Sequence, residues 1–577
     1  MRKNLFSFLI FFSILFSLNE TFAGWNPTPY TVATTASNNP QYMAPSLAFN
    51  QSGYVVAVWG HYNTFFIPAR CYQQAAISTD FGEHWFPAAD IDQASYQTNN
   101  KNTRPRVAVN DNNDALMTWH RYDSTLLPAG FDVRVCSLTN TPLGPTAQNL
   151  KTLDTNAGTS PSRPEIAMIG NTAIVVWSHD TAGANYFVYT STTTDSGTNW
   201  PLSATPISMG GLAASVAEPF PQLYFDATGL AVVVWQYSSD GSTFYALQSV
   251  SIDSGVTWST ASILSGPSND WTLPVVGGDG NGNVIAAWEE EIGPWPAPYD
   301  IKSSNYSTAS GWSTPQTIDT GINDWPYPRI TVNNNNQAIV TYQSADAGFT
   351  QYLVKTAFSS NGGQLWDVPV FVDPLNPNVN WKTCPEISMD NYGVALCVWN
   401  VENTSPNWII KGAVSTDYGS NWSITTLSPN AIVNSAGIPR VKSYILDSGN
   451  HNAVNGIAIW PHEDPGSFPF IPAFGVVEMN HFKEITLKAT GEQQKIKDFL
   501  QEELQNVITA DAIGEHGTFK LYKDAALTQL IDTKSNSHRV ATFIENNLKR
   551  GESFTYYVTW TDQFGKTVGP VIVRVDG

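Results

Sequence analysis

Five charged residues occupy the same position in a repeated segment of the sequence. Each directly follows a proline and precedes a hydrophobic residue, and the set is Arg106, Glu165, Arg329, Glu386 and Arg440. Guanidinium groups bind carboxylates through two parallel hydrogen bonds, so three arginines that converge would hold an anionic group. The alternative interpretation is that these arginines and glutamates pair with one another at a solvated surface.

The elements that carry these residues form a repeat with eight copies. Each copy reads Pro-x-hydrophobic, a short alternating strand, a turn of Gly, Asn or Asp, and an apolar strand that ends in an aromatic residue. The copies begin at Pro45, Pro105, Pro164, Pro221, Pro274, Pro328, Pro385 and Pro439. The final aromatic residues are Trp59, Trp119, Trp177, Trp235, Trp288, Tyr342, Trp399 and Trp460. A period of this size with short strands predicts radial repetition with four strands per unit, whereas the repeats of a solenoid are usually shorter or helical.

A second motif, Ser/Thr-x-Asp-x-Gly-x-x-Trp, follows five of these aromatic residues. Its central residues are Asp80, Asp195, Asp253, Asn361 and Asp417. The motif resembles the Asp-box, or bacterial neuraminidase repeat, of sialidase-like β-propellers, over about residues 24–480. We expect these carboxylates to accept backbone N–H groups and close turns, while the glycine supplies a positive φ. A catalytic role is not expected, because one active site does not need five copies.

The repeat and the resemblance together predict an all-β fold, a β-propeller with eight blades favoured and seven as the alternative. The eighth copy lacks a fourth strand, and residues 30–34 are predicted to supply it and so close the ring. The starts of the first strands and the ends of the second strands should then share one face. His179 and His462 follow strand-ending aromatics and belong to this face as candidates for ligand binding.

Three tryptophans precede the first strands of neighbouring repeats. Trp271 and Trp325 each end an Asn-Asp-Trp sequence, and Trp381 stands four residues before Pro385. A flat aromatic ring suits the apolar face of a sugar, and this predicts a glycan platform. The alternative is that the three rings pack between blades.

The resemblance to sialidases implies three arginines, a Tyr nucleophile with a Glu partner, and an Asp acid/base. The family's Arg-Ile-Pro motif is absent, since this chain has the reversed order Pro-Arg-Val at 105–107 and Pro-Arg-Ile at 328–330. No catalytic set can therefore be transferred. The sequence favours surface or glycan recognition, with an exo-sialidase-type glycoside hydrolase as the alternative, and leaves open whether the protein is an enzyme. We expect no cofactor and no metal, because GDGNGN at 278–283 is similar to a calcium loop but lies in a turn that every repeat has.

The N-terminus has the pattern of a secretory signal peptide over residues 1–23. Arg2 and Lys3 precede an apolar run that is shorter than the ~20 residues of a membrane span, and small residues lead to Ala23. The chain is therefore expected to be secreted, extracellular or periplasmic, without a membrane span after cleavage, and monomeric. The net charge of −20 argues against a nucleic acid or an anionic lipid as the main partner. A glycan or a cell-surface protein is the expected partner.

The four cysteines allow two disulfides, Cys384–Cys397 and Cys71–Cys136, or buried thiols. The composition changes near residue 480, where the repeats stop and charged residues become frequent. Residues 481–577 end in a segment that resembles the last two strands of a fibronectin type III or immunoglobulin-like domain. For this β-sandwich-like domain we predict strands at 518–523, 539–544, 554–560 and 567–575, and one short helix at 492–506.

Overall fold

The computed structural model describes most of the chain in a series of ranges. They are 22–25, 30–37, 45–63, 70–82, 84–92, 104–123, 130–154, 163–181, 185–201, 204–207, 212–293, 298–346, 348, 350–374, 384–404, 407–427, 432–433, 439–445, 454–463, 475–497, 502–513, 517–536, 540–548, 554–562 and 567–575. Every regular element in these ranges is a β-strand. Most of the expected signal peptide, residues 1–21, lies outside them.

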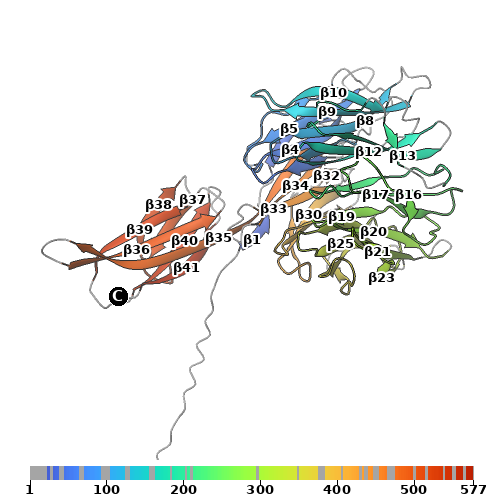
Figure 1. The fold of residues 1–577 in the computed structure, drawn as a ribbon. Coiled ribbons are helices and arrows are strands. Elements are labelled where there is room, and N and C mark those ends of the chain that lie inside the picture. Colours follow the sequence, from blue (N-terminus) through green and yellow to red (C-terminus); the bar gives the residue numbers. More distant parts are fainter. Residues whose placement is uncertain are drawn as a thin grey trace, which may run out of the picture. The chain divides into compact units, whose positions relative to one another are not determined.

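The chain forms two compact units. The larger comprises residues 24–446 and 454–482, and the smaller comprises residues 1–23, 447–453 and 483–577. Seven separate antiparallel sheets follow one another along the larger unit (Figure 1), and we number them in chain order.

Each of these sheets begins with a short strand at one edge. Sheet 1 contains β3 (Ser46–Phe49), β4 (Val55–Asn63), β5 (Arg70–Ser78) and β6 (Ala89–Asp90); sheet 2 contains β7 (Arg106–Val109), β8 (Ala115–Asp123), β9 (Gly130–Thr139) and β10 (Thr146–Asp154). Sheet 3 contains β11 (Glu165–Ile169), β12 (Thr172–Asp180), β13 (Tyr186–Thr193) and β14 (Thr205–Pro206); sheet 4 contains β15 (Gln222–Phe225), β16 (Ala231–Tyr237), β17 (Tyr245–Ser251) and β18 (Ser262–Ile263). Sheet 5 contains β19 (Val275–Gly278), β20 (Asn283–Glu291), β21 (Tyr299–Ser307), β22 (Gly311–Trp312) and β23 (Gln316–Ile322). Sheet 6 contains β24 (Arg329–Val332), β25 (Ala338–Ala345), β26 (Tyr352–Ser359) and β27 (Val370–Phe371); sheet 7 contains β28 (Glu386–Met389), β29 (Ala395–Thr404), β30 (Asn407–Ser415), β31 (Ser423–Thr426) and β32 (Ile432–Val433).

An eighth sheet is completed by the N-terminal part of the chain. Sheet 8 contains β33 (Arg440–Ile445), β34 (Val454–Glu463), the beginning of β35 (Gly475–Lys497) and β2 (Tyr30–Ser37), and β1 (Phe22–Trp25) also pairs with β35. Strand β2 is antiparallel to β35, with Tyr30 opposite Met479 and Thr34 opposite Val476. The predicted pairing of residues 30–34 with the last repeat is confirmed.

The second strand of each sheet forms the core because it lies between two strands and between two neighbouring sheets. Its run of small and β-branched residues, such as β16, is buried along its whole length. The repeated aromatic residue of every sheet is almost completely buried; these residues are Trp59, Trp119, Trp177, Trp235, Trp288, Tyr342, Trp399 and Trp460. Burying a large aromatic ring at each sheet-to-sheet contact contributes strongly to stability.

The short first strands contact one another in sequence. Strand β7 contacts β3 and β11, and the contacts continue through β15, β19, β24 and β28 to β33. Strand β33 in turn contacts β3, so the series of contacts returns to its start. This arrangement brings together the first residues of strands that lie far apart in the sequence.

The smaller unit contains two sets of strands. The later part of β35 pairs with β36 (Glu502–Ile513), which pairs with β39 (Val540–Leu548). A separate sheet has the order β38 (Leu530–Asn536), β37 (Gly517–Tyr522), β40 (Phe554–Asp562) and β41 (Thr567–Val575).

The expected helix at 492–506 is wrong, because residues 492–497 belong to β35 and residues 502–506 to β36, while 498–501 lie outside the described residues. Strand β36 pairs on one side with β35 and on the other with β39, so its backbone groups are bonded within the sheet. Apolar residues at helical spacing over so short a segment are also compatible with a strand, and tertiary pairing overrides helix propensity. The β-branched residues Val507, Ile508 and Thr509 favour the strand.

Candidate ligand-binding site

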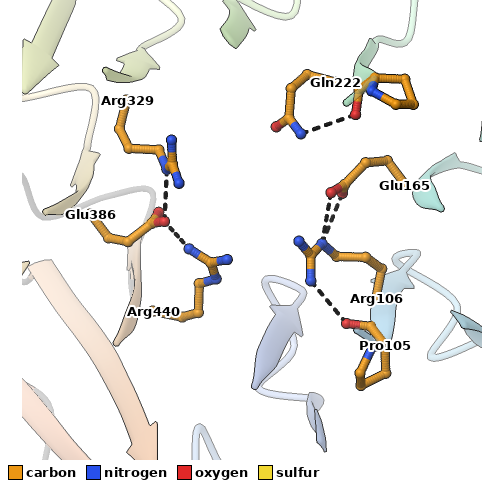
Figure 2. A network of polar contacts seen from close by, with 8 residues as sticks. Pro105, Arg106, Glu165, Gln222, Arg329, Glu386 and Arg440 are labelled. Atoms are coloured by element: carbon orange, nitrogen blue, oxygen red, sulfur yellow. Dashed lines mark hydrogen bonds and ion pairs between the residues drawn. The ribbon is translucent and has the colours of Figure 1, made fainter. Parts of the chain in front are cut away.

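The first residues of five strands carry the charged side chains that the repeat singled out. Arg106 begins β7, Glu165 begins β11, Arg329 begins β24, Glu386 begins β28 and Arg440 begins β33. Figure 2 shows them as two groups whose side chains point toward one another, Arg106 with Glu165 and Glu386 with the two other arginines. We call these five residues the strand-start cluster.

Each arginine of the strand-start cluster is bonded to a glutamate of a neighbouring sheet. The Nε atom of Arg106 donates to both carboxylate oxygens of Glu165, at 2.8 and 3.0 Å. The Nε atom of Arg329 donates to Oε1 of Glu386 at 2.9 Å, and Nη1 of Arg440 donates to the same oxygen. Glu386 therefore accepts hydrogen bonds from two arginines. The strand-start cluster contains three cationic and two anionic side chains.

The three arginines carry one positive charge more than the two glutamates offset, and solvent still reaches all three side chains. The side chains of Arg106, Arg329 and Arg440 keep 20%, 32% and 22% of their surface exposed. Burial, together with repulsion from Arg106 and Arg329, lowers the pKa of Arg440 below its usual value. Crowding of this kind favours an added anion, because an oxyanion would offset the repulsion among the guanidinium groups.

The residue before the repeated proline has an unusual backbone conformation in each of the six sheets where the structure describes that residue. These residues and their φ angles are Arg104 (38°), Arg163 (45°), Phe220 (52°), Leu273 (34°), Tyr327 (48°) and Cys384 (34°). A positive φ costs energy for a non-glycine residue, and a residue before proline normally adopts an extended conformation. Such strain persists only where neighbouring structure holds it, and it is frequent at functional sites. The sequence offered no signal for this feature.

Buried polar residues directly after the core aromatics hold these loops in place. Gln236 donates from its backbone N to the carbonyl of Pro219 at 2.8 Å and from Nε2 to the carbonyl of Glu218 at 2.6 Å. Gln343 contacts its loop in the same way, from N to the carbonyl of Pro326 at 2.7 Å. These bonds fix the loops that lead into β15 and β24.

In sheet 5 the equivalent residue is a buried carboxyl group, Glu289. Its Oε2 accepts a 2.7 Å hydrogen bond from the backbone N of Tyr327, and its Oε1 has no hydrogen-bond partner in the described part of the chain. Burial raises the pKa of Glu289 to about 8, with Asp270 and Asp324 adding to the increase and Arg329 opposing it. Sequence reasoning missed Glu289, although a run of three glutamates at the end of an apolar strand was a visible signal.

Two of the three candidate tryptophans, Trp325 and Trp271, have different environments in the structure. Trp325 is partly buried and its Nε1 donates to Oδ2 of Asp270 at 2.6 Å, so it is tied between sheets 5 and 6. Trp271 leaves 45% of its surface exposed and packs against Phe220, with 5.4 Å between the ring centroids. Trp381 lies outside the described residues.

The two candidate histidines are not brought together with the strand-start cluster by any described contact. The Nδ1 atom of His179 lies 2.7 Å from Oδ2 of Asp154, which also accepts from Nε1 of Trp177 at 2.8 Å. This carboxylate links β10 of sheet 2 to β12 of sheet 3. His462 lies in β34, and its side chain is outside the description.

The Asp-box residues close turns at the opposite end of the sheets. In the box of sheet 4, Oδ1 of Asp253 accepts from the backbone N of Thr257 at 2.8 Å and from Oγ of Ser251 at 2.8 Å. The same backbone bond, four residues ahead, is made by the other central residues Asp80, Asp195, Asn361 and Asp417. Ser251 pairs with Ala231 at the start of β16, whereas Gln222 pairs with Val234 near its end. The boxes thus lie away from the strand starts.

The GDGNGN turn is likewise closed by protein groups. Oδ1 of Asp279 accepts from the backbone N atoms of Asn281 and Asn283, at 2.8 and 3.1 Å. Asn50, Asn333 and Asp390 accept two backbone N–H groups in the corresponding turns of other sheets. Across the described ranges, no three His, Cys, Asp or Glu side chains are grouped so as to hold a metal ion.

Neither proposed disulfide is formed in the structure, because Cys136 and Cys397 are both buried thiols. In the pairing of β28 with β29, Cys397 lies opposite Ile387. Ile387 is three residues after Cys384 in the sequence, so Cys397 is not opposite Cys384. Cys136 packs with Ala75 and Ile77 of β5, and Cys71 lies four residues before Ala75, about 13 Å along the strand. Burial raises the pKa of both thiols, to about 12 for Cys397.

Comparisons with known proteins give weak likenesses only. No protein-family model matches the chain, and no curated protein matches it. Among solved structures, an ulvan lyase of polysaccharide lyase family PL25 is 10% identical over 76% of this chain and 92% of its own, with a TM-score of 0.37. A Hadza microbial sialidase is 12% identical over 60% and 73% with a TM-score of 0.35, and a leech intramolecular trans-sialidase is 10% identical over 79% and 70% with a TM-score of 0.33.

Proposed function

We propose that the larger unit is an eight-bladed β-propeller that recognises acidic glycans at its strand-start cluster. The cyclic series of contacts between first strands supports the propeller, with sheets 1 to 8 as its blades. The smaller unit, which follows near residue 480, is proposed as a fibronectin type III or immunoglobulin-like module that spaces or docks the propeller.

Secretion is part of this proposal. The charged and apolar pattern of residues 1–23 supports a cleaved signal peptide and an extracellular or periplasmic location. Within the described ranges we find no helix with the length and apolar character that crossing a membrane requires. A glycan or a glycosylated cell-surface protein is the proposed partner, and the protein is proposed to act as a monomer.

The observation that carries the proposal is the sharing of Glu386 by Arg329 and Arg440. One carboxylate cannot fully occupy two guanidinium groups, each of which has several donors in a planar fork. The carboxylate or sulfate of an acidic sugar would complete the bonding of these donors. The site is cationic in a protein whose net charge is −20, so the attraction of an anion is local.

A glycan array that compares acidic and neutral oligosaccharides tests this proposal. We expect the wild-type protein to bind acidic glycans, and Arg440→Ala to weaken binding by about tenfold or more, which corresponds to about 1.4 kcal/mol. Lys151→Ala on the outer strand β10 is the matched control and should bind like wild type. Equal binding of acidic and neutral glycans, or no effect of Arg440→Ala in a folded protein, would contradict the proposal.

Hydrolysis of sialosides is the alternative function, and the geometry gives it less support. The candidate nucleophile would be Tyr327, two residues before Arg329, whose backbone N donates to Glu289. However, burial and the charge of Glu289 raise the pKa of the Tyr327 phenol. A nucleophilic tyrosine needs the opposite shift. Release of a fluorophore from a sialoside by the purified protein, lost in Arg106→Ala, Arg329→Ala or Arg440→Ala, would favour the enzyme over the binding protein.

A further inference from the structure

We propose that Arg163, Phe220 and Trp271 form a platform for a second sugar ring of the acidic glycan. The inference rests on the proposed function and names a subsite beside the strand-start cluster. Three successive sheets supply the platform, since these residues lie in the loops that lead into β11, β15 and β19. We call the three residues the stacking platform.

The three side chains are layered. The guanidinium carbon of Arg163 lies 3.7 Å from the centroid of the Phe220 ring. The ring of Phe220 in turn lies 5.4 Å from that of Trp271, with an angle of 43° between the planes. An arginine against an aromatic face and a tilted aromatic pair are both favourable arrangements. Trp271 is the outermost layer and has 45% of its surface exposed.

Backbone conformation and hydrogen bonds on the buried side hold the stacking platform rigidly. Arg163 and Phe220 both have positive φ angles, at 45° and 52°, and each is followed by a proline. Glu218 bonds the guanidinium of Arg163, and Gln236 bonds the carbonyls of Glu218 and Pro219. A strained backbone that is braced on its buried side fixes the rings before any ligand arrives, which lowers the entropic cost of binding.

The occupant is inferred to be a pyranose ring that is joined to the sugar held by the strand-start cluster. Phe220 stands two residues before Gln222, and Arg163 two residues before Glu165, so the platform begins within about 7 Å of the strand starts along the chain. A sugar ring has one flat apolar face that suits an exposed indole. Arg106, which bonds Glu165 at the start of β11, belongs to the cationic cluster that selects a glycan carrying an acid.

Trp325 is the equivalent tryptophan of the next repeat, and its different environment supports a ligand-binding role for the exposed Trp271. Both residues end an Asn-Asp-Trp sequence, and both are preceded by an Asp whose Oδ1 accepts from the tryptophan N, at 2.7 and 2.8 Å. Only in Trp325 does the indole Nε1 donate to a carboxylate of the neighbouring sheet. The copy at Trp271 instead stacks on Phe220 and presents its indole to solvent.

Calorimetry with sugars of two lengths tests the inference. The probes are N-acetylneuraminic acid against 3′-sialyllactose, and galacturonic acid against trigalacturonic acid. In the wild type the longer member of a bound pair should bind more tightly. Trp271→Ala should remove about tenfold of affinity for the longer member and leave the monosaccharide unchanged, while Trp271→Phe restores most of the loss.

Trp312→Ala is the matched control, because Trp312 also forms a tilted pair, with Tyr306 at 5.3 Å, but lies near the opposite end of sheet 5. It should leave both affinities unchanged. Equal loss for the short and long sugars, or no loss in Trp271→Ala, overturns the stacking platform while the proposed function stands. A wild type that binds none of the acidic probes overturns the proposed function and the platform with it.

Discussion

At the scale of single residues, the most consequential group is a buried acid that the repeat does not predict. Glu289 replaces the amide of Gln236 and Gln343 at the position after the core aromatic, and it accepts the backbone N of Tyr327. An amide at this position is neutral, whereas a carboxyl group must bind a proton to be neutral. Burial raises the pKa of Glu289 to about 8, so the protonated form is favoured in the folded protein at neutral pH.

The stability of the protein should therefore fall as the pH rises. An unfolded glutamate releases its proton near its ordinary pKa of 4.5, whereas folded Glu289 retains it until about pH 8. Below the lower value both states are protonated and the group costs nothing. Through the window from 4.5 to 8 the free energy of unfolding should decrease, by an amount on the order of a few kcal/mol.

Glu289→Gln removes this dependence and should be more stable than wild type at pH 8. Urea unfolding at pH 5, 6.5 and 8 measures the difference between the two proteins. Glu290→Gln is the control, because that neighbouring carboxyl accepts from Trp288 Nε1 at 2.7 Å and its loss leaves Glu289 intact. A Glu289→Gln protein that keeps the wild-type pH slope would show that another group causes it.

At the scale of elements, the Asp-box turn joins one sheet to the sheet before it. The glycine of each of four boxes faces a branched side chain there: a Cβ on Gly197 would lie 2.5 Å from Leu116, and one on Gly255 2.7 Å from Ile174. Gly363 and Gly419 meet Ile285 and Ile339 in the same way. The box therefore sets both a turn and a packing distance between neighbouring sheets.

Variants of the box in sheet 4 should separate these two contributions. Asp253→Ala removes the acceptor of the Thr257 N–H and should cost about 1–2 kcal/mol, while ligand affinity stays the same because the turn lies at the other end of the sheet. Asp253→Asn keeps that acceptor, as Asn361 does in sheet 6, and should cost less.

Gly255→Ala should cost about 1–3 kcal/mol, since its φ is 81° and the added methyl meets Ile174. Thermal unfolding and glycan binding are measured on all three variants. Selective loss of binding in a folded Asp253→Ala protein would place the ligand site at the boxes.

The sequence predicts the elements better than it predicts the site. The prolines mark the starts of the first strands correctly, and the repeated aromatics lie in the second strands, because burial between sheets demands a large ring in every copy. The expectation that the aromatic ends its strand is wrong, since each second strand continues two to five residues beyond it. Local spacing fails at 492–506, where residues 492–497 of β35 pair with residues 502–507 of β36. The shared repeat position predicts that the arginines and glutamates lie together, and pairing between them is one of the two interpretations it allows. Which glutamate each arginine bonds depends on contacts between sheets. The exposure of Trp271 and the left-handed Phe220 depend on neighbours that no local pattern encodes.

At the scale of the whole molecule, the N-terminal strand β2 connects the beginning of the larger unit to its end. Val32 belongs to a buried cluster with Leu47 and Trp59 of sheet 1 and with Ile457 and Ile459 of sheet 8. The strand thus supplies hydrogen bonds to β35 and apolar surface to the contact between the last sheet and the first. Without it, β35 would present an unpaired edge within the larger unit.

Deletion of residues 24–36 from a chain expressed without residues 1–23 should sharply lower the melting temperature or cause aggregation, more than a typical terminal deletion does. Val32→Asp tests the apolar part alone and should cost about 3 kcal/mol or more, because it buries a charge among the side chains of sheets 1 and 8. Leu143→Asp is the matched control, since Leu143 is 87% exposed, and it should leave the melting temperature unchanged. Calorimetric unfolding and light scattering of the three proteins provide the measurement. If the deletion melts at the wild-type temperature and stays monomeric, pairing of β2 with β35 does not stabilise the molecule, and the remaining contacts between sheets 1 and 8, among them those of β3 with β33, are sufficient.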